Sequence, residues 1–341
     1  MLMRRLGRSD LNVSAVALGV MTFGAKTAEA EAFRQLDLAL AAGINLFDTA
    51  ENYPAPVRAD TQGRSEEILG HWIVARGIRS RVIVATKVAG PGNAAGDMTH
   101  IRGAERRLDR ANVIAAVDGS LRRLHTDYID LYQVHWPERP ITTFGRARFS
   151  YLPDAPTLVP IEETLAALGE LVVAGKIRHI GVANETPWGV MRYIIAAHEQ
   201  GLPRIVSIQN SYSLLERQLE VGLAEIAMRE QVAVLAYSPL ARGLLSGKYL
   251  DQAQDADGRI RFSGKRLAAT AAYADLAKRH GMDLPTMALA FVRQKPFMSS
   301  VLMAASNVAQ LESNLASLDV TLSKELVKEI DSIHDDVPNP R

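Results

Sequence analysis

The segment Gly43–Tyr53, which reads GINLFDTAENY, contains the pattern that decides the fold. Gly43 follows the alanine- and leucine-rich stretch Ala30–Ala42, and glycine readily adopts the left-handed conformation that ends a helix. The short run Asn45–Asp48 comes next, is typical of a buried strand, and ends on a carboxylate. A helix, a glycine and a short strand with a polar end form the unit of an α/β fold.

This unit recurs along the chain. The other short runs, predicted as strands, are Ala15–Leu18, Val82–Thr86, Ile129–Val134, Ile177–Val182, Ile205–Gln209, Val232–Tyr237 and Ser300–Met303. Predicted helices alternate with them at Ser65–Arg76, Arg110–Leu124, Pro160–Ala174, Pro187–Gln200, Leu219–Glu230 and Ala268–His280. Such alternation predicts right-handed crossovers and a parallel sheet, and the eight strands indicate a closed (β/α)8 TIM barrel. We expect a single α/β barrel domain over residues 1–341, with extra helices near the C-terminus.

An open, doubly wound sheet is the competing fold. It is marked by a G-x-G-x-x-G turn after the first strand, whereas residues 19–24 read GVMTFG, so the spacing is wrong. The segment Met1–Ser14 precedes the first barrel strand. Its halves, Arg4–Gly7 and Leu11–Ser14, predict a small β-hairpin that closes the N-terminal mouth of the barrel.

Composition excludes several classes of function. Of the 341 residues, 39 are basic and 38 acidic, and the formal net charge of +1 predicts no nucleic-acid or membrane partner. The chain has no cysteine, which excludes disulfides, thiolate nucleophiles and cysteine-bound metals, and we expect no metal site. Because neither a signal-peptide core nor an apolar run of about 18 residues occurs, we expect a cytoplasmic protein. The composition leaves the oligomeric state open, a homo-oligomer included.

Ionisable side chains stand at the ends of three neighbouring predicted strands. These are Asp48, Lys87 and His135, and Tyr53 lies in the loop after Asp48. Strand ends of this kind carry the ligand-binding groups of a barrel. A lysine cation lowers the pKa of a nearby tyrosine, and a carboxylate keeps the lysine charged. We therefore predict Tyr53 as a general acid for a carbonyl oxygen that His135 orients, with hydride from a nicotinamide cofactor.

Each of these residues also has a structural interpretation. Asp48 and Lys87 by themselves suit a buried ion pair, and a lone histidine on an apolar face is more often part of the core. A strand-end lysine is also found in Schiff-base aldolases, although a tyrosine and an aspartate beside it fit proton transfer better. The convergence of all four groups on one rim favours the catalytic interpretation.

The segment Gly43–Tyr53 resembles the active-site signature of the aldo-keto reductase family. The stretch LRRLHTDYID at 121–130, followed by LYQVHWP, resembles the family's second signature, and GVANETPWG at 181–189 and YSPLARGLLSGKY at 237–249 resemble further blocks. The resemblance runs from about Leu6 to His334. It is closest to the bacterial Tas-type group and more distant to potassium-channel β-subunits. It implies the catalytic tetrad Asp48, Tyr53, Lys87 and His135 and the NADPH-dependent reduction of aldehydes and ketones. A slowly turning NADPH-binding regulatory subunit is the alternative.

The resemblance also implies how the cofactor would lie. The nicotinamide would stack on Tyr237, and Asn184 and Gln209 would hold its carboxamide. Residues Ser238, Leu240 and Lys248 would lie along the pyrophosphate, Gln310 and Asn314 near the adenosine, and Arg242 and Ser306 are also expected to contact the cofactor.

Two departures from the family pattern concern the cofactor. Ala183 replaces a serine, which is expected to remove one carboxamide hydrogen bond, about 0.5–1.5 kcal/mol. The loop Met303–Asn307 contains no cation for a 2′-phosphate, so NADH remains an alternative to NADPH. We expect one of the basic residues after the seventh strand to contact that phosphate; the candidates are Arg259, Arg261, Lys265 and Arg266.

Overall fold

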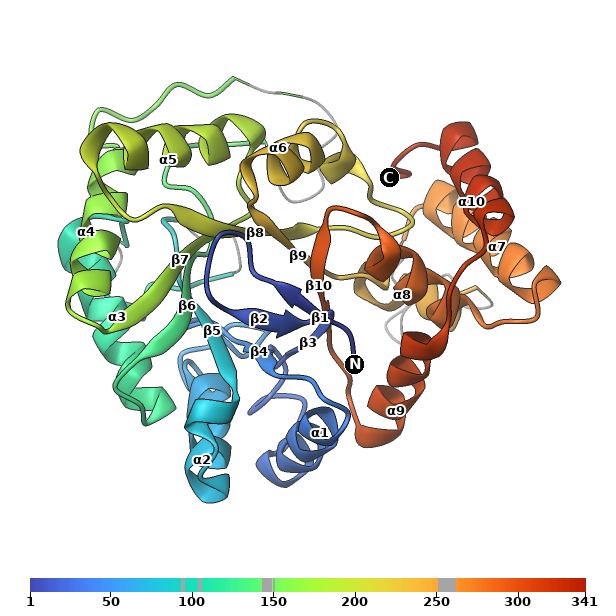
Figure 1. The fold of residues 1–341 in the computed structure, drawn as a ribbon, viewed down its shortest axis with the longest axis horizontal. Coiled ribbons are helices and arrows are strands. Elements are labelled where there is room, and N and C mark those ends of the chain that lie inside the picture. The colour runs from blue at the N-terminus through green and yellow to red at the C-terminus, as the bar shows by residue number, and fades with distance from the viewer. Residues whose placement is uncertain (93–95, 104–105, 143–148, 150, 251–261) are drawn as a thin grey trace.

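Eight parallel strands close into a barrel in the order β10-β3-β4-β5-β6-β7-β8-β9 (Figure 1). The computed structural model describes residues 1–341 except 93–95, 104–105, 143–148, 150 and 251–261. The barrel strands are β3 (Val16–Gly19), β4 (Leu46–Asp48), β5 (Ile83–Val88), β6 (Ile129–Val134), β7 (Ile177–Ala183), β8 (Ile205–Ser211), β9 (Ala233–Tyr237) and β10 (Met298–Met303). The predicted (β/α)8 barrel is therefore confirmed.

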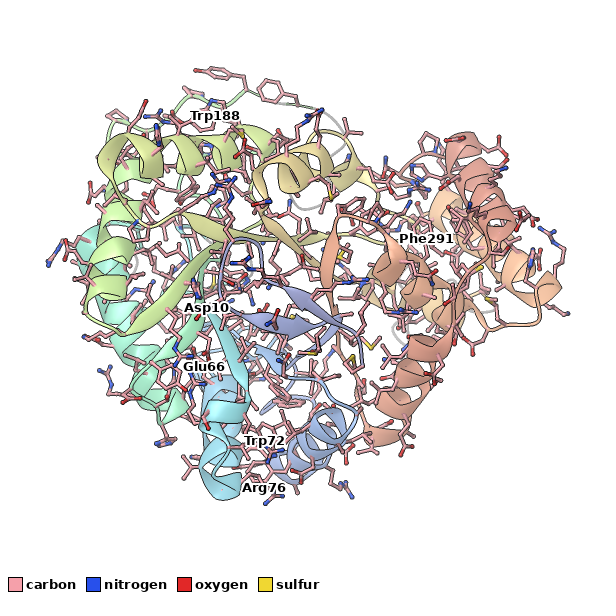
Figure 2. All side chains as sticks on the ribbon, in the orientation of Figure 1. Asp10, Glu66, Trp72, Arg76, Trp188 and Phe291 are labelled. Carbon is pink, nitrogen blue, oxygen red and sulfur yellow. The ribbon has the colours of Figure 1, made fainter. Side chains whose placement is uncertain are left out.

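Helices surround the barrel and cover the outer faces of its strands. They are α1 (Glu29–Ala41), α2 (Arg64–Arg76), α3 (Arg110–Leu124), α4 (Ile161–Val173), α5 (Pro187–Gln200) and α6 (Leu223–Glu230). Side-chain caps set several of the helix starts: Asp109 before α3 and Thr186 before α5 each accept a hydrogen bond from the backbone N–H three residues on. Trp72 of α2, labelled in Figure 2, lies with its ring centroid 5.1 Å from that of Phe47 of β4.

The N-terminal hairpin closes one end of the barrel, as predicted. It pairs β1 (Met3–Arg5) with β2 (Asn12–Ser14) in antiparallel register, and it lies across the centre of the barrel in Figure 1. Leu6, Leu11 and Val13 are buried in one cluster with interior residues of the barrel; these include Leu46, Ala85, Leu131 and Leu235. Apolar side chains therefore fill the N-terminal half of the interior, and the polar strand ends lie at the opposite mouth.

Further helices follow in the C-terminal part of the chain: α7 (Gly264–Arg279), α8 (Leu284–Gln294), α9 (Val308–Ala316) and α10 (Lys324–Asp336). Helices α8 and α9 complete the ring around the barrel, and α7 and α10 are additional, which confirms the predicted extra helices. Helices α7 and α10 pack against each other at the side of the barrel, and α9 lies beside α1 (Figure 1). Helix α8 is buried almost all round and packs on β10.

Some predicted details are wrong. The predicted helix Leu219–Glu230 is broken at Gly222, whose φ of 87° separates a short 3-10 turn from α6. Ala268–His280 corresponds to α7, but the helix that covers the barrel between β9 and β10 is α8, for which no helix was predicted. Alternation along the strands predicts Ile44 on the face of Leu46 and Ile129 on the face of Leu131, but Ile44 and Ile129 pack instead in the outer core between strands and helices. Within the described residues, no helix has the length and apolarity needed to cross a bilayer.

The packing of α2 on α3 requires a glycine. A Cβ added at Gly70 would lie 2.6 Å from the backbone carbon of Leu124 and 2.7 Å from the carbonyl oxygen of Arg123. Alanine improves helix propensity by about 1 kcal/mol, but forced overpacking costs about 1–3 kcal/mol and more where backbone must move. We expect Gly70→Ala to lower the free energy of unfolding in urea by about 1–2 kcal/mol.

Gly119 of α3 offers the matched control. A Cβ there meets only the guanidinium end of Arg123, at 3.1 Å, which can move away. Gly119→Ala should be neutral or should stabilise the fold by up to about 1 kcal/mol. Equal effects of the two substitutions would contradict this account of the α2–α3 contact.

Candidate active site

Asp48 is the centre of a polar layer inside the barrel. Its Oδ1 accepts a hydrogen bond from Lys87 Nζ at 2.5 Å. Its Oδ2 accepts from Gln133 Nε2 at 3.1 Å and from Gln209 Nε2 at 2.8 Å. All four side chains are buried, and they come from β4, β5, β6 and β8. Alternate residues of a barrel strand face inward, so the residues two positions earlier also lie in the interior. On three of these strands they are the apolar residues Leu46, Ala85 and Leu131.

Lys87 has no exposed surface, and its ammonium group makes two contacts. Nζ donates to Asp48 and, at 2.8 Å, to the carbonyl oxygen of Thr49. Burial lowers the pKa of Lys87, and the Asp48 carboxylate opposes that change. The ion pair is thus held where water is excluded, which strengthens its field on neighbouring groups.

Tyr53 lies in the loop after β4, next to this ion pair. Its ring centroid is 5.2 Å from Lys87 Nζ and 5.6 Å from the ring centroid of His135. Burial raises the pKa of Tyr53 above its ordinary value, and the charge of Asp48 raises it further. The expected lowering of this pKa by Lys87 is therefore wrong for this arrangement, because burial disfavours the phenolate and the Asp48 carboxylate adds to that effect. The phenol is protonated at neutral pH, which is the state that a proton donor needs.

His135 follows β6 and faces the same site. Its Nδ1 lies 3.0 Å from Asn52 Oδ1, and its carbonyl oxygen accepts a hydrogen bond from Asn184 Nδ2 at 2.9 Å. The indole of Trp136 packs beside the imidazole at a centroid distance of 4.8 Å. Burial lowers the pKa of His135 well below its ordinary value, and Lys87 adds to this effect. The imidazole is therefore neutral at pH 7.

A buried carboxylate holds the segment between Asp48 and Tyr53 in place. Glu51 accepts a hydrogen bond from the backbone N–H of Ala89 at 2.6 Å and forms an ion pair with Arg102. Its own carbonyl oxygen accepts from Gln62 Nε2 at 2.5 Å. These contacts attach the loop after β4 to the loop after β5, so two strand ends of the site are fixed relative to each other.

The residues expected to hold a nicotinamide carboxamide meet beside His135. Tyr237 donates its hydroxyl to Asn184 Oδ1 at 2.6 Å, and Gln209 Nε2 donates to Asp48. Within the described residues, one N–H of Asn184 and Oε1 of Gln209 have no other partner. One spare donor and one spare acceptor match the C=O and NH2 of a carboxamide, so these residues fit the nicotinamide group. Ala183 lies buried beside Gln209 in the β7–β8 pairing and offers no side-chain donor.

The loop after β9 contains the residues expected along the pyrophosphate. Ser238 has a φ of 54° and Arg242 a φ of 59°, values that are unusual outside glycine and concentrate at binding sites. Leu240 precedes a short 3-10 helix at Ala241–Ser246, and Arg242 and Lys248 are exposed. Cations on such a strained loop suit an anionic ligand.

The residues expected near the adenosine lie after β10, at the start of α9. The backbone N–H of Ser306 donates to Gln310 Oε1 at 2.7 Å, and buried Asn314 lies 3.5 Å from the carbonyl oxygen of Ala304. Among the described contacts, none joins these three residues to the tetrad. The structure thus brings the tetrad, Asn184, Gln209 and Tyr237 into one cluster and places the other predicted cofactor residues on the loop after β9, on the loop after β10 and on helix α9.

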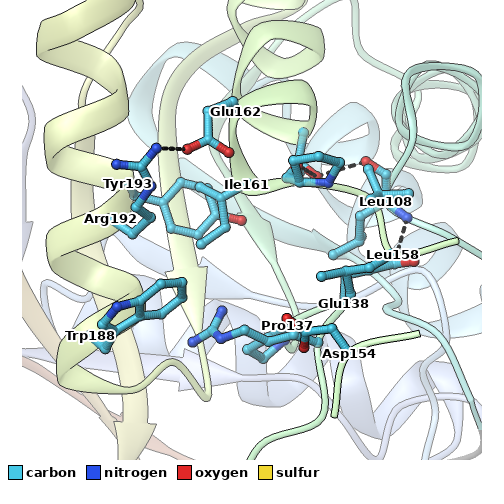
Figure 3. Close-up of a pocket in the computed structure, with 14 residues that line it drawn as sticks. Leu108, Pro137, Glu138, Asp154, Leu158, Ile161, Glu162, Trp188, Arg192 and Tyr193 are labelled. Carbon is cyan, nitrogen blue, oxygen red and sulfur yellow. Dashed lines mark hydrogen bonds and ion pairs between the residues drawn. The ribbon is translucent and has the colours of Figure 1, made fainter. Parts of the chain in front are cut away.

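A cavity of about 190 Å³ lies outside the polar layer, between the segment after β6 and helices α4 and α5 (Figure 3). None of the tetrad residues lines it. Two of its arginines form ion pairs: Arg192 with Glu162, and Arg139 with Glu185 of the β7 end. The guanidinium of Arg139 also lies 4.7 Å from the ring of Trp188. This side cavity supplies no catalytic group.

Three residues that build the site were not predicted from the sequence. Gln133 is an amide inside the apolar run Ile129–Val134, two residues after the inward-facing Leu131, and this position is a signal in the sequence that could have indicated it. Glu51 and Asn52 stand inside the quoted motif, but their contacts, to Arg102 and His135, depend on loops far away in the sequence.

The buried neutral histidine predicts a pH dependence of stability. Because the pKa of His135 is depressed in the folded state, the unfolded chain takes up a proton as the pH falls below about 6.5 and the folded chain does not. Stability from this group is therefore present above that pH and is lost on acidification. We expect the free energy of unfolding in urea to fall between pH 7 and pH 5 in both proteins. The fall should be about 1–2 kcal/mol smaller for His135→Gln than for the wild type.

His198→Gln, which replaces an exposed histidine of α5, is the control variant for the same measurement. If His135→Gln and the wild type lose stability in parallel, the buried histidine is not neutral as described.

Known proteins share this arrangement of fold and motifs. Residues 15–335 match the profile of the aldo/keto reductase family. Protein tas of Escherichia coli is 49% identical over 338 residues, covering 97% of this chain and 96% of that protein, which confirms the predicted likeness to the Tas-type group. An aldo-keto reductase of Babesia bovis is 37% identical (75% and 96% covered), and the uncharacterized oxidoreductase YrpG of Bacillus subtilis is 32% identical (96% and 94% covered). With a matching profile, a matching barrel and these relatives, the chain belongs to the aldo/keto reductase family of oxidoreductases.

Proposed function

We propose that this protein reduces aldehydes or ketones to alcohols with NADPH and that Tyr53 is the proton donor. The observation that carries the proposal is the contact of a protonated phenol with a buried ammonium–carboxylate pair and a neutral imidazole at one mouth of the barrel. Carbonyl reduction needs such a donor, because oxygen becomes basic as hydride reaches carbon. A nicotinamide cofactor, when bound, supplies that hydride.

Each member of the tetrad has one task in this proposal. Tyr53 donates its hydroxyl proton to the substrate oxygen, and the nearby ammonium of Lys87 stabilises the phenolate that remains. Asp48 keeps Lys87 charged and in position. Neutral His135 orients the substrate oxygen by a hydrogen bond, because the described part of the chain leaves its Nε2 without a partner.

Three arginines near the loop after β9 favour a phosphorylated cofactor. Burial lowers the pKa of Arg266, and Arg242 and Arg341 lower it further, so the three cations lie close together. Glu216 is the acidic group that opposes this effect. Within the described residues, Nε of Arg266 and Nη1 of Arg341 are buried without an acceptor. The 2′-phosphate of NADPH is an anion that would satisfy these donors, whereas NADH has none there.

The catalytic proposal is tested with Tyr53→Phe. Removing the hydroxyl should lower kcat for an aromatic aldehyde by about 100-fold or more, because the general acid is lost while the ring remains. The measurement is the loss of near-ultraviolet NADPH absorbance. Tyr128→Phe, at the other end of β6, is the matched control and should keep its activity.

Equal activity of Tyr53→Phe and the wild type would remove Tyr53 from the mechanism. If the wild-type protein binds NADPH tightly yet reduces no member of a panel of aldehydes and ketones, the proposed reductase function is rejected in favour of the NADPH-binding regulatory subunit considered above.

The choice of cofactor is tested with Arg266→Gln. We expect the Kd for NADPH to rise about 10-fold, the loss of a charged hydrogen bond, while the Kd for NADH changes little. Both constants come from fluorescence titration of the nucleotide, without turnover. Lys265→Gln, at the neighbouring candidate whose side chain is exposed, is the comparison and should change the Kd for NADPH less than Arg266→Gln does. An equal rise in the Kd values for NADPH and NADH would show that Arg266 does not contact the 2′-phosphate. Arg259 and Arg261, the other candidates, lie outside the described residues.

A further inference from the structure

The side-chain amide of Asn52 is the one polar group that contacts the ring of His135 within the described chain. Asn52 is buried, and its Oδ1 lies 3.0 Å from His135 Nδ1. The other end of the same amide, Nδ2, is buried and has no hydrogen-bond partner among the described residues. A buried N–H without an acceptor destabilises the fold, so this orphan group requires an explanation.

The orientation of this amide decides which nitrogen of His135 carries the proton. A neutral imidazole has one N–H and one lone pair. When the amide oxygen faces Nδ1, the proton must be on Nδ1 and Nε2 has only its lone pair. When the NH2 group faces Nδ1, it donates to the lone pair there, and the proton is on Nε2.

Only the second arrangement suits a carbonyl substrate. A carbonyl oxygen, and still more the alkoxide formed from it, accepts hydrogen bonds, so it needs a donor at Nε2. With the oxygen of Asn52 toward Nδ1, the lone pair of Nε2 would face the lone pairs of the substrate oxygen. Rotation of the amide by about 180° exchanges Oδ1 and Nδ2 within nearly the same volume. After that rotation one N–H of Asn52 donates to His135 Nδ1, while Oδ1 occupies the buried position where Nδ2 had no partner, so the choice between the two orientations rests on the donor that the substrate oxygen needs.

We propose that Asn52 is a positioning residue that donates from Nδ2 to His135 Nδ1 and so keeps the imidazole proton on Nε2, where it can bind the substrate oxygen. This inference rests on the proposed carbonyl reduction. Asn52 is suited to the task because the chain on either side of it is fixed. Glu51 is held by Ala89 and Arg102, and the backbone N–H of Tyr53 donates to the carbonyl oxygen of Ala50 at 3.0 Å.

The test compares two substitutions of nearly equal size. In Asn52→Asp, an ionised carboxylate accepts from Nδ1–H and forces the unsuitable tautomer. In Asn52→Leu, the hydrogen bond is lost but neither tautomer is imposed. We expect kcat to fall about 100-fold in the aspartate variant and about 10-fold or less in the leucine variant, with KM changing less than kcat. A purely structural hydrogen bond predicts the reverse order, because aspartate keeps that bond and leucine does not.

The tautomer itself is read by nitrogen NMR of protein labelled with 15N-histidine at pH 7.5, with the signals of His135 identified by their absence in His135→Gln. We expect the proton on Nε2 in the wild type and on Nδ1 in Asn52→Asp. A wild-type proton on Nδ1, an Asn52→Asp spectrum still showing Nε2–H, or equal kcat values for the two variants would each overturn the proposal. If the aspartate variant does not fold, the wild-type spectrum decides. The spectrum does not depend on turnover. If the wild type shows Nε2–H but reduces no carbonyl compound, the proposed reduction is rejected while the tautomer inferred for His135 still holds.

Discussion

The buried ion pair between Asp48 and Lys87 is the constraint on which the rest of the site depends. Two charges without access to water are costly unless further hydrogen bonds satisfy them. Here the partners are Gln133, Gln209 and the carbonyl oxygen of Thr49. Gln133 and Gln209 come from strands that are distant in the sequence, so the pair has all of its partners only when β4, β5, β6 and β8 are assembled in the barrel.

The same exclusion of water sets the protonation states that chemistry needs. Burial keeps the phenol of Tyr53 protonated and the imidazole of His135 neutral. A protonated acid beside an ammonium group can release its proton when a stronger base forms next to it, and a neutral imidazole can donate a hydrogen bond without competing for that proton. The hairpin at the other end contributes indirectly, since Leu6, Leu11 and Val13 fill the interior below the polar layer.

The loops add a second level of support. Glu51 and Arg102 join the loops after β4 and β5, and Tyr237, Asn184 and His135 are linked in series across the ends of β9, β7 and β6. Each loop is thereby positioned by contacts with another loop as well as by its own strand. Three arginines, Arg242, Arg266 and Arg341, gather near the loop after β9, and in the proposed function this is where the anionic part of the cofactor would bind.

The sequence by itself determined the barrel, the hairpin and the four residues at the strand ends, because strand and helix periods and strand-end positions are local properties of the chain. It did not determine the break at Gly222, the role of α8 or the partners of Asp48 and Asn52. It also predicted the wrong direction for the pKa of Tyr53: proximity to Lys87 was inferred, but the opposing charge of Asp48 and the depth of burial were not. Burial, charge balance and hydrogen bonds between distant loops arise only when the chain is packed, so the tertiary structure alone decided them.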